Sequence, residues 1–96
     1  IDVGHVYRNQ EDAAMMIKKY KNRLFDIHMK DIDKAVLEGK PQELGRGNMD
    51  IPAIIKALKK IKYKGIVAFE YEKDGNDPFW GLAESVGYVK ALDKVL

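Results

Sequence analysis

Two short runs, residues 24–29 and 66–71, are each followed by an amphipathic helical pattern, and this alternation limits the possible folds strongly. Both runs are largely apolar and contain aromatic or β-branched residues, which is typical of interior strands of a parallel sheet. Strands joined by helices at such short spacing imply parallel pairing through right-handed crossovers. The sequence therefore predicts an α/β fold.

Three helices are predicted around these strands. Asn9 followed by Asp12 indicates a helix start, so the first helix covers roughly residues 10–21. Asp50 can cap a second helix after a polar, glycine-containing loop. The apolar stripe of that second helix is Ile51, Ile54, Ile55, Leu58 and Ile61.

The last helix is predicted from Asp77 and Pro78, which form a typical cap and first-turn pair. We expect Phe79 and Trp80 either to pack from this helix onto the rest of the fold or to form an apolar wall at a ligand site, and packing is favoured. The apolar positions of the helix are Leu82, Val86, Val89, Leu92 and Leu96.

Residues 1–3, Ile-Asp-Val, look like the end of a strand whose beginning is missing, because no turn or cap introduces them. Two strands and a remnant cannot close a barrel, and a sheet this small would leave unpaired edges. We therefore expect residues 1–96 to be the C-terminal part of a single domain.

Composition excludes several classes of function. The 17 basic and 15 acidic residues are dispersed and leave a net charge of +2, which argues against a nucleic-acid partner. The chain has no cysteine, so disulfides and thiolate metal sites are excluded. No apolar run approaches the roughly 20 residues that span a bilayer, and no export signal is evident. By default we expect a cytoplasmic protein without a membrane partner; if the protein is exported, its signal lies upstream of Ile1.

Asp2, His28 and Glu70 fall at the C-terminal ends of the predicted strands. Ligand sites of parallel α/β folds lie at these ends, and neighbouring strands are only about 4.8 Å apart. Two carboxylates and an imidazole suit a divalent ion such as Mn²⁺, Mg²⁺, Co²⁺ or Zn²⁺. A single acid or histidine there is more often a cap or surface group, so the coincidence of three favours a metal site.

Other polar residues share this region. His5 follows the first strand end and is either a group that supports the ligands, a substrate contact or a plain loop histidine. Asp26 and Lys30 share the face of His28 by strand alternation. For Asp26 we favour a structural role, in an ion pair or a solvated strand end.

Four motifs follow one another along the chain: D-x-G-H at 2–5, H-x-K-D at 28–31, L-G-x-G-x-x-D at 44–50 and a strand ending in Glu70. In this order they resemble the last third of the xylose-isomerase-like TIM-barrel superfamily, which includes sugar-phosphate isomerases and epimerases, ketose 3-epimerases, inosose dehydratases and the endonuclease IV group. The resemblance implies strands six to eight of a (β/α)8 barrel, with the N-terminal part of the barrel as the missing partner.

The resemblance also implies roles for individual residues. Asp2, His28 and Glu70 correspond to three of four metal ligands, and the fourth, a glutamate on an earlier strand, is not among these residues. Glu70 corresponds as well to one of the two acid/base groups of the epimerases. His5 corresponds to a substrate-contacting histidine.

Lys30 and Arg46 complete the candidate substrate contacts. Many sugar epimerases place an arginine shortly before the Gly-x-Gly turn, whereas Arg46 lies inside it. An exposed turn residue is therefore an equal interpretation of Arg46.

The implied activity is isomerisation or epimerisation of a keto sugar, sugar phosphate or polyol derivative, through an enediolate and with a divalent metal. One alternative is a non-catalytic sugar-binding barrel. An endonuclease IV-like phosphodiesterase is disfavoured, because the Asp-x-His pair of that group is absent from residues 39–43. We expect these 96 residues alone to be inactive, and the sequence leaves a homo-oligomer open.

Overall fold

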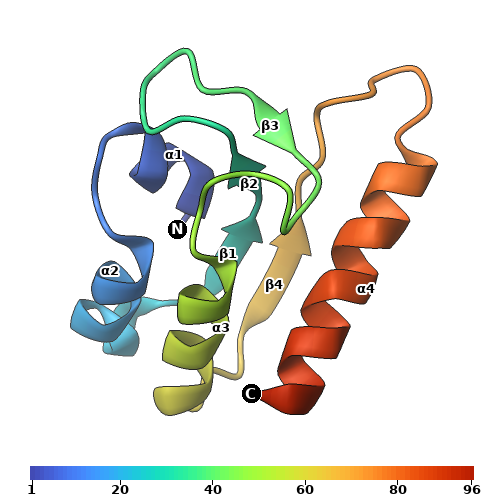
Figure 1. The fold of residues 1–96 in the computed structure, drawn as a ribbon. Helices are drawn as coiled ribbons and strands as arrows, with labels where there is room; N and C mark the ends of the chain where they lie inside the picture. The colour runs from blue at the N-terminus through green and yellow to red at the C-terminus, as the bar shows by residue number, and fades with distance from the viewer.

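A computed structural model describes residues 1–96 and contains a small parallel sheet flanked by helices (Figure 1). Strand β1 (Asp26–Met29) pairs in parallel with β4 (Ile66–Phe69), and His28 lies opposite Ala68. These strands are shorter than predicted, because residues 24–25 and 70–71 lie outside the ladder. The parallel pairing confirms the predicted α/β class.

The first two residues form a third strand position beside β1. The Ile1 nitrogen donates to the Asp26 carbonyl oxygen at 3.2 Å, and the His28 N–H donates to the Ile1 carbonyl oxygen at 2.8 Å. Asp2 and His28 form a parallel bridge. The predicted strand remnant is therefore present, in the spatial order residues 1–2, β1, β4.

The helix with the strongest sequence pattern forms as predicted. Helix α3 (Ile51–Lys60) is capped by Asp50, whose carboxylate accepts the Ala53 N–H at 3.0 Å. Capping of this kind satisfies one of the free N–H groups at a helix start. The apolar stripe is buried at Ile51, Ile54, Ile55 and Leu58, whereas Ile61, predicted as its last member, follows the helix as its C-cap and is half-buried.

The region before β1 differs from the prediction. Helix α2 (Ala13–Lys19) is capped by Asp12 and ends in a short 3₁₀ turn, η1 (Lys21–Arg23), so the predicted helix over 10–21 was too long. Asn9 does not start it. Instead, Asn9 ends an additional helix, α1 (Val3–Arg8), which the sequence interpretation missed.

Helix α4 (Phe79–Val95) also begins differently. Pro78 occupies the cap position without a side-chain hydrogen bond, so the prediction of Asp77 as the cap was wrong. Phe79 and Trp80 contact each other edge to face at 5.0 Å and are mostly exposed, so neither ring packs onto the sheet within these residues. Of the predicted stripe, Val86, Val89 and Leu92 are half-buried, whereas Leu82 and Leu96 are exposed.

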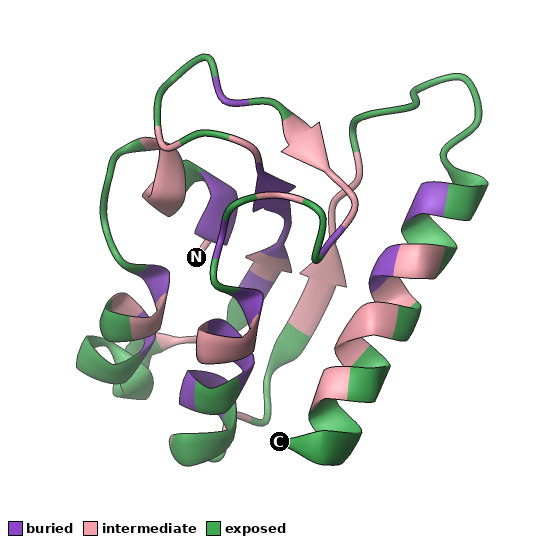
Figure 2. Ribbon diagram, viewed as in Figure 1, coloured by how far each residue is buried: buried purple, intermediate pink, exposed green.

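The core lies between one face of the sheet and helices α2 and α3 (Figure 2). Ile27 and Met29 of β1 are fully buried in it, while Asp26 and His28 point to the opposite face by strand alternation. A short antiparallel pair, β2 (Asp31–Ile32) and β3 (Pro41–Gln42), extends beyond the end of β1. The polar face of β1 is therefore separated from the core.

Candidate functional site

Asp2, His28 and Glu70 meet at the C-terminal ends of the three adjacent parallel strand positions. Their potential ligand atoms all lie within 4.8 Å of one another. The Nδ1 atom of His28 is 2.8 Å from Oε1 of Glu70, and the Glu70 N–H donates to the Met29 carbonyl oxygen at 3.0 Å, which continues the β4 backbone beside β1. The topology of the sheet thus brings together residues that are 68 positions apart.

The two oxygens of Asp2 have different partners. Oδ1 accepts the N–H groups of Gly4 at 2.9 Å and His5 at 3.1 Å and so caps helix α1. Oδ2 is 3.5 Å from the ammonium of Lys30. Burial alone would raise the pKa of Asp2, but the His5 N–H and the charge of Lys30 outweigh it, so the pKa is lowered. Asp2 is therefore both a cap and an ionised group of the site.

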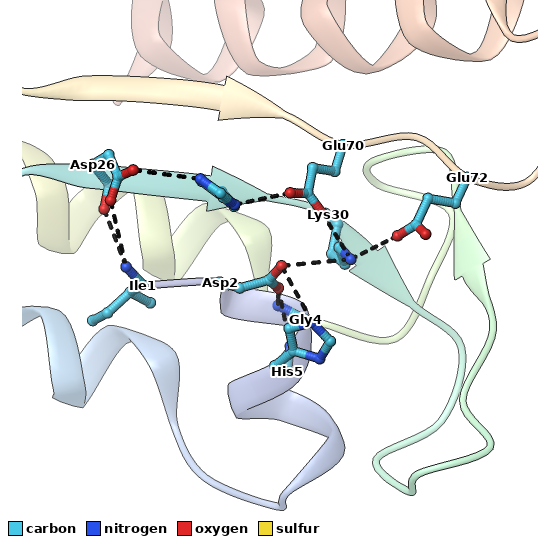
Figure 3. Close-up of polar contacts among 9 residues, drawn as sticks. Ile1, Asp2, Gly4, His5, Asp26, Lys30, Glu70 and Glu72 are labelled. Atoms are coloured by element: carbon cyan, nitrogen blue, oxygen red, sulfur yellow. Dashed lines mark hydrogen bonds and ion pairs between the residues drawn. The ribbon is translucent and has the colours of Figure 1, made fainter.

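Lys30 lies at the centre of the carboxylates (Figure 3). Its side chain is 3% exposed, and its Nζ atom is 2.9 Å from Glu70 Oε2 and donates to Glu72 Oε1 at 2.8 Å. Burial alone would lower the pKa of Lys30, but the hydrogen bonds to Glu72 and Glu70 outweigh it and raise the pKa. The hydrogen bond from Lys30 lowers the pKa of Glu72. A fixed positive charge therefore faces three carboxylates.

Gly4 provides the space for this lysine. A Cβ atom at Gly4 would overlap Cγ and Cδ of Lys30, which have no free side to move to because the side chain is buried. The glycine of D-x-G-H is therefore explained by the lysine of H-x-K-D.

The second nitrogen of His28 also has an acidic neighbour. Nε2 is 3.4 Å from Oδ2 of Asp26, whose side chain is largely exposed. Histidine ligands of metals commonly donate their other ring N–H to a carboxylate, which fixes the tautomer and the ring orientation. Asp26, for which a structural role was favoured from sequence, lies in the position to orient His28.

The remaining candidates differ in position. His5 is exposed, with Nε2 at 3.6 Å from Asp2 Oδ2, so it lies at the edge of the group. Arg46 forms a two-bond ion pair with Glu84 of α4, with distances of 2.6 and 2.8 Å, and does not contact the group. A substrate contact by Arg46 stays a prediction.

Asp31 is a buried polar residue to which the sequence interpretation gave no role. Its carboxylate accepts four backbone N–H groups, from Ile32, Gly45, Gly47 and Met49, at 2.9 to 3.1 Å. Burial raises its pKa, although each of these bonds favours the carboxylate. Asp31 therefore ties the start of β2 to the Gly-x-Gly loop.

Glycines are needed at both positions of that loop. A Cβ atom at Gly47 would overlap the Asp31 carboxylate, and Gly45 has a φ of +93°, which L-residues rarely adopt. Glu72 was the other missed residue. Alternation along the chain from Glu70 would place Glu72 on the same face, but it does not indicate the contact with Lys30.

These donors fit a divalent ion. Two carboxylates and one imidazole within reach of one another match the ligand preferences of Mn²⁺, Mg²⁺, Co²⁺ or Zn²⁺. Glu70 and His28 are both partly exposed, so a small ligand has access to them. The arrangement can hold an ion and present a carboxylate beside it.

Comparison with known proteins assigns the family. A family model described as xylose isomerase-like TIM barrel matches residues 1–92. The chain therefore belongs to the xylose isomerase-like TIM-barrel family, as the motif resemblance predicted, and its parallel strands are part of such a barrel.

Individual relatives are similar over a limited part of their length. An inosose dehydratase of Clostridium perfringens is 35% identical over 88 residues, which cover 76% of this chain and 30% of the relative. The rhizopine catabolism protein MocC of Rhizobium meliloti is 29% identical over 90 residues, which cover 78% of this chain and 28% of the relative. The chain thus spans about a third or less of these relatives.

A solved structure shows the same fold. The structure of L-ribulose 3-epimerase superposes with a TM-score of 0.79 at 17% identity, covering 98% of this chain and 35% of the epimerase. None of the helices of the chain has the length and apolar character needed to cross a membrane.

Proposed function

We propose that the intact protein is a divalent-metal-dependent enzyme that isomerises or epimerises a keto sugar, a sugar phosphate or a related polyol derivative by proton transfer. The observation that carries the proposal is the convergence of Asp2, His28 and Glu70 at the carboxyl ends of parallel strands. Active sites of TIM barrels lie at this end. Family membership and the likeness to L-ribulose 3-epimerase and inosose dehydratases support it.

In this proposal Asp2, His28 and Glu70 hold the ion, and Asp26 orients His28. The ion would supply Lewis-acid polarisation of a substrate carbonyl. Glu70 removes or returns the proton on the carbon next to that carbonyl, since a positioned carboxylate is a suitable general base. Lys30 holds one oxygen of Glu70 at 2.9 Å, so the carboxylate is oriented before the ion binds.

Lys30, His5 and Arg46 are the proposed substrate contacts. Lys30 is 3% exposed and its ammonium faces three carboxylates, so it would contact a sugar oxygen in place of one of them. The exposed His5 lies at the rim of the site. Arg46 would need to leave Glu84 to reach a substrate.

Loss of water from a keto polyol is the second candidate, favoured by several relatives that are named inosose dehydratase. Such a reaction can begin with the same proton removal by Glu70 but ends with loss of a hydroxyl group. The product distinguishes the two candidates.

The test uses the intact protein with saturating Mn²⁺ and a panel of keto sugars and keto polyols in deuterated water. Glu70→Gln keeps the size but removes the proton-accepting group, so turnover should fall by about 10² to 10⁴-fold. Deuterium should enter the substrate carbon with wild-type protein and not with the variant.

Glu43→Gln is the matched control, because Glu43 pairs with Lys73 outside the site and its loss should leave turnover unchanged. Wild-type turnover and wild-type deuterium incorporation in Glu70→Gln would exclude Glu70 as the acid/base group. An intact protein that binds none of Mn²⁺, Mg²⁺, Co²⁺ and Zn²⁺ would refute the proposed function itself.

A further inference from the structure

Lys30 contacts two kinds of carboxylate at once. Asp2 and Glu70, at 3.5 and 2.9 Å from Nζ, are proposed metal ligands, whereas Glu72, at 2.8 Å, is not. Glu72 is two residues beyond Glu70 and mostly exposed, so its free oxygen remains in water. The ammonium therefore stands between the ligand carboxylates and an independent acidic partner.

A divalent ion and Lys30 compete for the same carboxylate oxygens, those of Asp2 and Glu70. An ion held by Asp2 and Glu70 takes the negative charge that now balances the ammonium, and it also repels the ammonium. A buried cation that loses its partners is strongly unfavourable. Lys30 can keep a partner through Glu72.

The surroundings restrict how Lys30 can respond. Its stem packs against Gly4 and is buried, so only the end of the side chain has freedom to move. Because Nζ already donates to Glu72 at 2.8 Å, it keeps that partner if an ion takes the oxygens of Asp2 and Glu70.

We propose that Lys30 is an internal counter-ion of the ligand carboxylates and that Glu72 takes over its charge when the metal binds, so that this pair sets the metal affinity. The inference rests on the proposed metal site. Lys30 lowers the affinity by competing for oxygens, and Glu72 raises it by retaining the lysine. The two residues therefore act on metal binding in opposite directions.

The test is the dissociation constant of the intact protein for Mn²⁺, measured by titration calorimetry without substrate. A single close charge changes the proton affinity of a carboxylate by about tenfold or more, and we expect effects of at least that size here. Lys30→Met should bind Mn²⁺ about tenfold more tightly, and Glu72→Gln should bind it about tenfold more weakly.

Glu72→Asp separates contact from charge. Aspartate keeps the negative charge but is one methylene shorter, so it should lose the contact with Lys30 and weaken Mn²⁺ binding as well. In the Lys30→Met background, Glu72→Gln should have little further effect on the Mn²⁺ affinity, because Lys30, the partner of Glu72, is absent. Lys64→Met, which removes an exposed lysine before the start of β4, at the other end of the strand from Glu70, is the control for net charge and should bind normally.

Three results would overturn the inference: Lys30→Met and Glu72→Gln shift the affinity in the same direction, Glu72→Asp binds like wild type, or the Glu72 effect persists undiminished without Lys30. Because Glu72 is exposed, its variants should fold, and their Mn²⁺ affinity can be measured even if Lys30→Met fails to fold. If wild-type protein binds none of Mn²⁺, Mg²⁺, Co²⁺ and Zn²⁺, the proposed function fails. If it binds an ion normally but the variants do not differ, only this inference fails.

Discussion

Replacing Asp31 with Asn should destabilise the protein strongly, because its carboxylate accepts four backbone N–H groups. Oδ1 of Asp31 accepts the N–H groups of Ile32 and Met49, and Oδ2 accepts those of Gly45 and Gly47. Asparagine has one acceptor oxygen, so two N–H groups would face an NH₂ group instead. Asp31 is fully buried, and water cannot replace the lost acceptor.

The size of the effect follows from these two lost bonds. Each hydrogen bond to a charged group contributes about 1.5–3 kcal/mol. Burying a neutral amide is cheaper than burying a carboxylate, which offsets part of the loss. We therefore expect a net loss of about 3 kcal/mol, which corresponds to a fall of about 6–12 °C in the melting temperature of an intact barrel.

The assay is thermal unfolding of the intact protein followed by circular dichroism. Asp33→Asn is the matched control, since Asp33 accepts a single backbone N–H, that of Lys40, at 2.7 Å. Its cost should stay below about 1.5 kcal/mol. If Asp31→Asn melted no lower than Asp33→Asn, the four bonds would not fix the loop, and the argument for Asp31 would be refuted.

Two further predictions concern the site. Gly4→Ala should destabilise the intact protein by about 1–3 kcal/mol in urea unfolding, because the new methyl group overlaps the stem of Lys30; Gly75→Ala, which meets no neighbour, should be near neutral, and equal effects would contradict the packing argument. His28→Ala should lose most of its bound divalent metal in elemental analysis of the purified intact protein, whereas His5→Ala, at the rim, should keep it. Equal metal content in wild type and His28→Ala would remove His28 from the ligands.

Elements with a local signal were predictable from sequence. Helix α3 carries its cap, Asp50, and its apolar stripe within a dozen residues, and both form as expected. Helix α1 has only six residues and contains Gly4, so it offers no periodicity to recognise. It is held by the Asp2 cap and by burial of Val3, which depends on the rest of the fold.

The convergence of Asp2, His28 and Glu70 was predictable, because the C-terminal ends of adjacent parallel strands lie side by side regardless of the loop conformations. The contacts of Asp31 and Glu72 were not, because they depend on how distant loops close: Asp31 binds N–H groups 14 to 18 residues away, and Glu72 meets Lys30 across 42 residues. Hydrophobic pattern carries no information about such polar partners.

The overlap that a side chain at Gly4 would create with Lys30 has a consequence for protein design. An engineer who transplants the H-x-K-D strand end into another barrel must also introduce a glycine after the neighbouring strand. Without that glycine, the stem of the lysine has no space. Conversely, a related chain with a short residue in place of Lys30 is free to vary at position 4. The two positions should therefore be exchanged together in chimeric barrels, and a library that randomises one should randomise the other.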